Sequence, residues 1–145
     1  SRIHAQAYED AALISAHLTP KTAAYHEIWL KTEGAEDEGE TIKIAASPIE
    51  DEEEPIYGKT YLPRKFKIAI AIPPYNDTDI YSNDVGLIAI EKNGELIGYN
   101  IVAGGGLGMT FGMPETYPRL ASRLGFVRRE NMIKAVENIV TIQRD

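Results

Sequence analysis

The sequence predicts an α+β fold, in which a mixed or antiparallel β-sheet with an Asn-Gly hairpin is packed by helices. Apolar residues recur at helical spacing near both ends of the chain, which predicts a helix at each end. Residues 64–72 alternate as a strand does, and Asn93-Gly94 separates two further apolar runs, at residues 85–91 and 96–102. Because Asn-Gly supplies the positive φ angles of a tight type I′ turn, these two runs are expected to form a hairpin.

The first third of the chain predicts one helix and an acidic excursion. The helix should end before Pro20, with an inner face made of Ile3, Ala7, Ala11, Ile14 and Leu18. Short strands are predicted at residues 23–30 and 42–44. Residues 33–54 hold ten acidic residues and one base, so they are predicted to be an acidic surface insertion, partly disordered, within a single domain that spans residues 1–145.

The strand predicted at residues 64–72 has two unlike faces. In a strand, residues two apart share a face. The core face is expected to carry Phe66, Ile68, Ile70 and Ile72, and the other face Lys65, Lys67, Ala69 and Ala71. Two cations beside two small side chains leave room for a large, flat, negatively charged group. Lysines that protect an exposed strand from edge pairing give the same pattern, and the pattern alone favours that explanation.

A glycine loop at residues 104–108 follows the hairpin and is expected to lead into two helices. Such a loop can present backbone N–H groups to an anion, although it matches neither the dinucleotide nor the phosphate-loop pattern, and a flexible connection is the alternative. One helix is predicted from about Pro114 to Gly125, the other from about Arg129. Inward-facing residues are expected to be Tyr117, Leu120, Ala121 and Leu124 in the first, and Met132, Val136, Ile139 and Val140 in the second. Solvated helix surface is expected for Arg119, Arg123, Arg128 and Arg129.

Composition excludes several kinds of site. The chain has no cysteine, so it can form no disulfide, thiolate nucleophile or cysteine-held cluster, and His4, His17 and His26 lack metal-ligand spacing. Of the net charge of −7, residues 33–54 contribute −9, which leaves +2 elsewhere and permits an anionic ligand. Lys and Arg are scattered, so no nucleic-acid partner is expected. No apolar run approaches the roughly 20 residues of a membrane span, and no membrane partner is expected.

The two lysines belong to the segment Tyr61-Leu62-Pro63-Arg64-Lys65-Phe66-Lys67. This segment resembles the strand with two active-site lysines of the siroheme-dependent sulfite/nitrite reductase family, and within it of the assimilatory sulfite reductase hemoproteins. The similarity continues through Ile72-Pro73-Pro74-Tyr75-Asn76-Asp77, Tyr81-Ser82-Asn83-Asp84, Gly98-Tyr99-Asn100, Gly104-Gly105-Gly106, Thr116-Tyr117 and Thr141-Ile142-Gln143-Arg144-Asp145. It leaves out the acidic stretch.

The resemblance implies a six-electron reduction of sulfite to sulfide at a siroheme coupled to a 4Fe–4S cluster. Lys65 and Lys67 are then the expected catalytic residues, since protonated amines near the iron bind the anion and donate protons as S–O bonds break. The residues expected beside the cofactor are Arg64, Asn83, Gly104, Gly105 and Gly106. Of these, Arg64 is expected to brace its neighbours rather than touch the substrate.

The chain also departs from the family pattern. The distal arginines, the four cluster cysteines and the further basic residues that hold the siroheme are not among its residues. It is therefore expected to be an internal piece of a longer cytoplasmic protein, to bind no cofactor or metal alone and to be inactive alone. The electron donor stays open between an NADPH-dependent flavoprotein and ferredoxin. Two alternatives also stay open: a ferredoxin-nitrite reductase relative, and a non-catalytic anion-binding or interaction domain.

Overall fold

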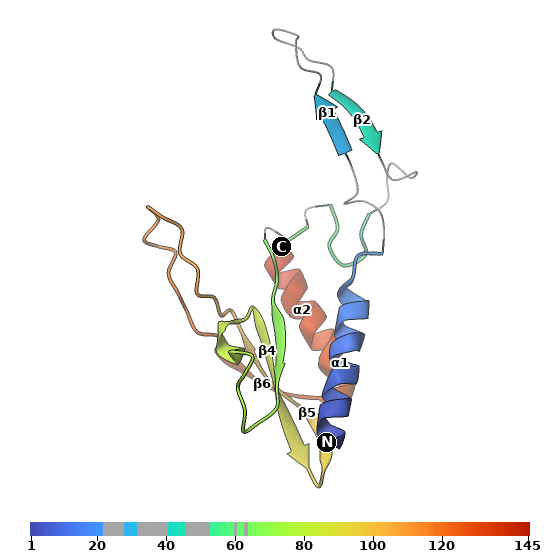
Figure 1. Ribbon diagram of the computed structural model, residues 1–145, viewed down its shortest axis with the longest axis vertical. Helices are drawn as coiled ribbons and strands as arrows, with labels where there is room; N and C mark the ends of the chain where they lie inside the picture. Colours follow the sequence, from blue (N-terminus) through green and yellow to red (C-terminus); the bar gives the residue numbers. More distant parts are fainter. Residues whose placement is uncertain (22–27, 32–40, 46–52, 60, 63) are drawn as a thin grey trace. The chain divides into compact units, whose positions relative to one another are not determined.

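The structure is a computed structural model that describes residues 1–21, 28–31, 41–45, 53–59, 61–62 and 64–145, without the side chains of 28–31 and 41–45. Its contacts divide the chain into two compact units. The first combines Ser1–Leu18 with Leu62–Asp145, and the second is Thr19–Tyr61. Figure 1 shows the elements of both units. The second unit therefore covers more of the sequence than the insertion expected at residues 33–54.

The first unit is built on a four-stranded sheet of order β3-β4-β5-β6. Its strands are β3 (Ile68–Ala71), β4 (Val85–Lys92), β5 (Glu95–Ala103) and β6 (Ser122–Arg128). β3 pairs with β4 in parallel, while β4–β5 and β5–β6 pair in antiparallel register. The sheet is therefore mixed, and the predicted α+β class is confirmed.

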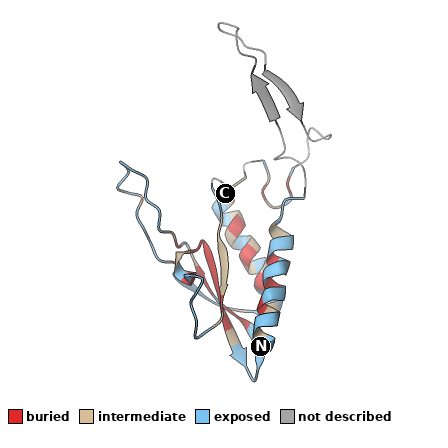
Figure 2. Ribbon diagram, viewed as in Figure 1, coloured by how far each residue is buried: buried red, intermediate tan, exposed pale blue. Residues whose placement is uncertain are grey.

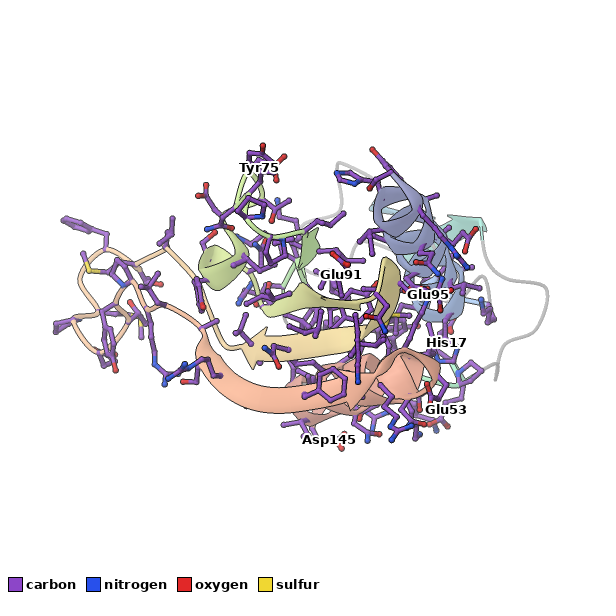
Figure 3. The ribbon with its side chains drawn as sticks, turned by 90° about the horizontal axis from the view of Figure 1, so that it is seen from below. His17, Glu53, Tyr75, Glu91, Glu95 and Asp145 are labelled. Carbon is purple, nitrogen blue, oxygen red and sulfur yellow. The ribbon has the colours of Figure 1, made fainter. Side chains whose placement is uncertain are left out.

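The predicted hairpin is confirmed. Asn93 and Gly94 have φ angles of 55° and 78°, as a type I′ turn requires, and Lys92 pairs with Glu95 across it. The Gly94 N–H also donates a hydrogen bond to Glu91 Oε1 at 2.8 Å. Glu91 and Glu95, which flank the turn, are labelled in Figure 3.

Two helices, α1 (Arg2–Leu18) and α2 (Met132–Arg144), contact each other and β5, and they lie side by side in Figure 1. The predicted inner face of α2 is largely confirmed, because Met132, Val136 and Val140 are buried. The two helices are joined by His17 Nε2 and Glu137 Oε2, 2.6 Å apart. The hydrogen bond from Lys134 and then the one from His17 lower the pKa of Glu137. No helix among the described residues is long and apolar enough to cross a membrane.

The inner face of α1 carries an acid that the apolar pattern did not predict. Ala7 and Ile14 are buried as expected, but Ala11 is exposed and Asp10 is buried, at 2% exposure. The Tyr99 hydroxyl donates to Asp10 Oδ2 at 2.5 Å, and Arg129 Nε lies 3.0 and 2.9 Å from the two carboxylate oxygens. Burial, followed by the hydrogen bond to Asp10, raises the pKa of Tyr99. The expectation that Arg129 is solvated helix surface is therefore wrong.

The face assignment predicted for β3 is wrong. The strand is shorter than residues 64–72, and Ala71, expected on the open face, is buried in a cluster with Ile80, Val102 and Ala121. The residues expected to form the core are only half-buried: Phe66, Ile68, Ile70 and Ile72. The short 3-10 helix η1 (Ile80–Ser82) contacts β3 and fills the space beside its small alanine side chains. Figure 2 shows buried residues concentrated on the sheet.

The helix predicted at residues 114–125 is also wrong. The chain has no regular structure from 107 to 121, apart from a bridge between Gly106 and Arg119, and then forms β6. Gly125, predicted as the stop of the helix, lies inside β6 opposite Ile101. Pairing with β5 gives this segment its backbone hydrogen bonds, and such non-local pairing overrides a local apolar spacing. Of the four residues predicted to face inward, only Ala121 is buried.

The second unit contains an antiparallel pair, β1 (Ile28–Lys31) and β2 (Thr41–Ala45). The strand predicted at residues 42–44 is confirmed, and that at 23–30 is confirmed for 28–30, while 23–27 lie outside the described residues. One acid of the expected surface insertion is in fact buried: Glu54 is 2% exposed, and its Oε2 accepts a hydrogen bond from the Lys21 N–H at 3.2 Å. Residues 32–40 and 46–52 lie outside the described part.

Candidate anion-binding cleft

The first unit contains an open cleft of about 980 Å³. One wall is the segment 64–67, which precedes β3, and another is the loop that leaves β5 at residues 104–110. The end of α2 contributes Ile139, Ile142 and Gln143. Among the lining residues are four cations (Arg64, Lys65, Lys67 and Arg119) and two acids (Asp84 and Glu115), which gives the wall a formal charge of +2. The predicted lysines and glycines therefore meet in one place, and the cleft is suited to an anion.

Lys65 and Lys67 both line the cleft, although they stand before β3 rather than within it. Lys65 is exposed, and its amine makes no hydrogen bond or ion pair to any residue that the structure describes. Lys67 is half-buried, with Nζ 3.4 Å from the Ser82 carbonyl oxygen. Phe66 also belongs to the cleft wall, so the alternation predicted for a strand does not hold here.

Asp84, which the sequence did not predict as a site residue, organises this wall. Its side chain is 6% exposed, and the Arg64 guanidinium donates from Nη2 to Oδ1 and from Nη1 to Oδ2, the latter at 3.4 Å. Arg64 Nη1 also donates to the Lys65 carbonyl at 2.8 Å, and the Lys67 N–H donates to Asp84 Oδ2 at 2.7 Å. The signal in the sequence is the position of Asp84 in the Tyr81-Ser82-Asn83-Asp84 motif, next to Asn83, which is predicted to lie beside the cofactor.

Asn83 is hydrogen-bonded to the glycine loop through its backbone. It is buried, and its Nδ2 donates to the carbonyl oxygens of Thr78 and Asp79 at 3.1 and 3.0 Å. The backbone carbonyl oxygen of Asn83 accepts a hydrogen bond from the Gly105 N–H at 3.1 Å. Asn83 is not among the residues that line the cleft. Direct contact between Asn83 and a cofactor stays a prediction.

The three predicted glycines have different reasons to be glycine. Gly104 has a φ of +81°, which favours glycine. A Cβ on Gly105 would lie 2.1 Å from the Tyr81 carbonyl oxygen, so this position must remain small for the loop to pack. A Cβ on Gly106 would meet no atom within 4 Å. Of the three, only Gly106 combines a place in the cleft wall with open space in front of it.

Ligands for metal ions are not gathered in this part of the chain. The described residues contain no group of three or more His, Cys, Asp or Glu side chains that could hold a metal ion. With no cysteine in the whole sequence, the chain itself offers no thiolate to an iron–sulfur cluster. The N–H groups of Gly104, Gly105 and Gly106 donate to the carbonyl oxygens of Asp84, Asn83 and Arg119, so the expectation that these glycines present N–H groups to an anion is wrong. The cationic groups of the cleft wall are two lysine amines and two guanidinium groups.

Comparison with known proteins matches the whole chain to one group. The family described as nitrite and sulphite reductase 4Fe-4S domain matches residues 9–145. The sulfite reductase (NADPH) hemoprotein beta-components of Geobacillus thermodenitrificans (strain NG80-2) and Shewanella sp. (strain ANA-3) are each 53% identical over 146 residues, and that of Geobacillus kaustophilus (strain HTA426) is 52% identical. Each match covers 100% of this chain and 24% of the relative, so the chain spans about a quarter of their length.

Proposed function

This chain belongs to the nitrite and sulphite reductase 4Fe-4S domain family, and on that premise we propose that it is part of a sulfite reductase hemoprotein. The proposed enzyme reduces sulfite to sulfide by six electrons at a siroheme coupled to a 4Fe–4S cluster. The observation that carries the proposal is the cationic cleft, in which Lys65 and Lys67 lie in one wall and a glycine loop forms another. A cleft of this charge suits both a dianionic substrate and a cofactor that carries carboxylates.

The two implied cofactors fit this chain differently. No residue of the chain can replace the cysteines of a 4Fe–4S cluster, so that group needs ligands from elsewhere. The siroheme fits, because the cleft wall has a formal charge of +2 and Gly106 leaves open space for a flat group. We propose that Gly106, whose N–H and carbonyl both pair with Arg119, lies against the siroheme, and that Lys65 and Lys67 hold the anion bound to it. When bound, the siroheme would pass to sulfite the electrons that the external donor supplies.

We propose that the two lysines bind sulfite and deliver protons. The sulfite oxygens carry negative charge, and an ammonium group forms strong, charge-assisted hydrogen bonds with them. When an S–O bond breaks, the leaving oxygen must take up protons to depart as water, and a lysine ammonium beside it can donate one. Half-burial of Lys67 strengthens its attraction to an anion, because less water screens the charge. Lys65, which is more exposed, can be reprotonated from solvent.

The test of this function compares the 145-residue chain with the full-length protein from which its sequence comes. We expect the full-length protein to show a siroheme-type visible spectrum and to reduce sulfite. The chain alone should be colourless and inactive, because it lacks the cluster ligands. A siroheme spectrum together with sulfite reduction by the chain alone would contradict this division of labour. A full-length protein with higher kcat/KM for nitrite than for sulfite would favour the nitrite reductase alternative.

Several further properties belong to the same proposal. We propose an NADPH-dependent flavoprotein rather than ferredoxin as the electron donor, because the names of the similar hemoproteins specify NADPH. We also propose that residues 1–145 form part of one siroheme-binding domain, which carries the acidic insertion at about residues 33–54. The cytoplasmic location stays a prediction that fractionation of the source cells can check.

A matched pair of glycine variants separates packing from cofactor approach. In the full-length protein, Gly105→Ala should lower the thermal midpoint, because its methyl group would meet the Tyr81 carbonyl. Gly106→Ala should leave the midpoint unchanged but reduce the siroheme content, because the added methyl group points into open space that the cofactor would fill. Melting curves and the ratio of siroheme absorbance to protein check both. Full siroheme content in Gly106→Ala would argue against close approach at this glycine.

A further inference from the structure

We infer that Asp84 is a positioning residue that fixes two walls of the cleft at once, and that Arg64 serves this fixation instead of offering its charge to the anion. Asp84 stands directly before β4, beside the start of the parallel β3–β4 pair. It is 5% exposed. A carboxylate this deeply buried persists only where charged and hydrogen-bonding partners compensate its lost hydration.

The side chain of Asp84 holds the cationic wall. Its two oxygens accept hydrogen bonds from both terminal nitrogens of Arg64, and Oδ2 also accepts the Lys67 N–H at 2.7 Å. Lys67 is also an acceptor, because its backbone carbonyl accepts a hydrogen bond from the Val85 N–H at 3.1 Å. Lys67 is thus fixed at both its N–H and its carbonyl before β3 begins.

The backbone of Asp84 holds the glycine wall. Its carbonyl oxygen accepts a hydrogen bond from the Gly104 N–H at 2.9 Å, and the preceding carbonyl, of Asn83, accepts one from the Gly105 N–H at 3.1 Å. The loop that contains Gly106 therefore starts from the same residue that orients Lys67. A change in the geometry of Asp84 therefore reaches both walls.

The charges of the cleft divide accordingly. Arg64 and Asp84 form a bidentate ion pair, so their formal charges cancel. Their side-chain exposures are 57% and 6%. The remaining lining charges are Lys65, Lys67 and Arg119 against Glu115, which again sum to +2. The excess positive charge that faces an anion then resides in the two lysines and Arg119. Removing Arg64 alone would leave a buried carboxylate unpaired at the edge of the anion site.

The experiment is a double-mutant cycle in the full-length holoenzyme with Arg64→Gln, Asp84→Asn and the double variant. Its kinetic part rests on the proposed function. Arg64→Gln should raise the KM for sulfite about tenfold, because the unpaired Asp84 carboxylate repels the anion. The double variant should return to within about threefold of wild type, because its cleft has the wild-type net charge and the amide oxygen of the introduced asparagine can still accept the Lys67 N–H.

The second readout is the thermal midpoint, which does not depend on turnover. We expect the decreases in thermal midpoint of the two single variants to add up to more than the decrease in the double variant. The reason is that the two side chains share one interaction, which either single substitution removes. Additive midpoints would overturn the inference. If the midpoints are not additive but the double variant does not restore KM, the pair has only a structural role. That outcome would also overturn the inference. If the wild-type holoenzyme did not reduce sulfite, the proposed function would fail, while the midpoints would still decide the pairing of Arg64 with Asp84.

Discussion

Replacing Lys65 or Lys67 by methionine in the full-length protein is expected to lower the rate of sulfite turnover by about a hundredfold or more, if each amine acts as one preorganised donor to the developing charge. Both side chains line the cleft, and neither belongs to the buried core. Methionine retains most of the aliphatic length of lysine and removes only the charge and the donated proton. The siroheme content and the thermal midpoint should therefore change little.

The matched control is Lys92→Met. Lys92 is an exposed lysine at the end of β4, beside the hairpin turn, and it does not line the cleft. The same chemical change there should leave turnover as in wild type. Steady-state sulfite reduction, visible absorption and melting of the three variants give the answer. Wild-type turnover in both cleft variants would remove the lysines from the mechanism, and a loss of siroheme in either would assign that lysine to cofactor binding instead.

The elements that were predicted correctly are those encoded by neighbouring residues. The hairpin follows from the backbone preferences of Asn93 and Gly94 alone, and α2 from apolar residues one helical turn apart. The segment that became β6 has similar helical spacing, but its structure is decided by pairing with β5, which its own residues do not reveal. The prediction of which face of β3 is buried was wrong for a related reason. The helix η1, which packs against the β3 alanines, comes from a later part of the chain.

The candidate site divides in the same way. Lys65, Lys67 and the glycine loop were found because the residue types and their family resemblance point to anion chemistry, and the structure brings them to one cleft. Asp84 was missed because an aspartate before a strand is ordinarily interpreted as a turn residue. Its role depends on Arg64, 20 residues earlier, and on Gly104, which no local pattern connects to it. The same holds for Asp10, whose partners Tyr99 and Arg129 lie 89 and 119 residues away.

Asp10→Ala is expected to lower the free energy of unfolding of the 145-residue chain by about 3–5 kcal/mol, the usual cost of removing one member of a buried ion pair. The Asp10 carboxylate is 2% exposed and accepts hydrogen bonds from Tyr99 and Arg129, which belong to β5 and to the short helix η2 (Arg129–Asn131). Its loss would leave the fully buried Tyr99 hydroxyl without its acceptor. It would also leave the Arg129 guanidinium without its main counter-charge, and would weaken the attachment of α1 to β5.

Two control variants make this prediction specific to the buried network. Glu9→Ala removes a second acid from the same guanidinium, 3.2 Å from Nη2, but Glu9 has a side-chain exposure of 67%, so its loss should cost less than about 1 kcal/mol. Tyr99→Phe removes one hydrogen bond to Asp10 and keeps the ring packed, for an expected cost of about 1 kcal/mol. Urea unfolding followed by circular dichroism and fluorescence ranks the three variants. If Asp10→Ala costs no more than Glu9→Ala, the carboxylate does not hold α1 to the sheet, and the apolar contacts of Ala7 and Ile14 must hold it instead.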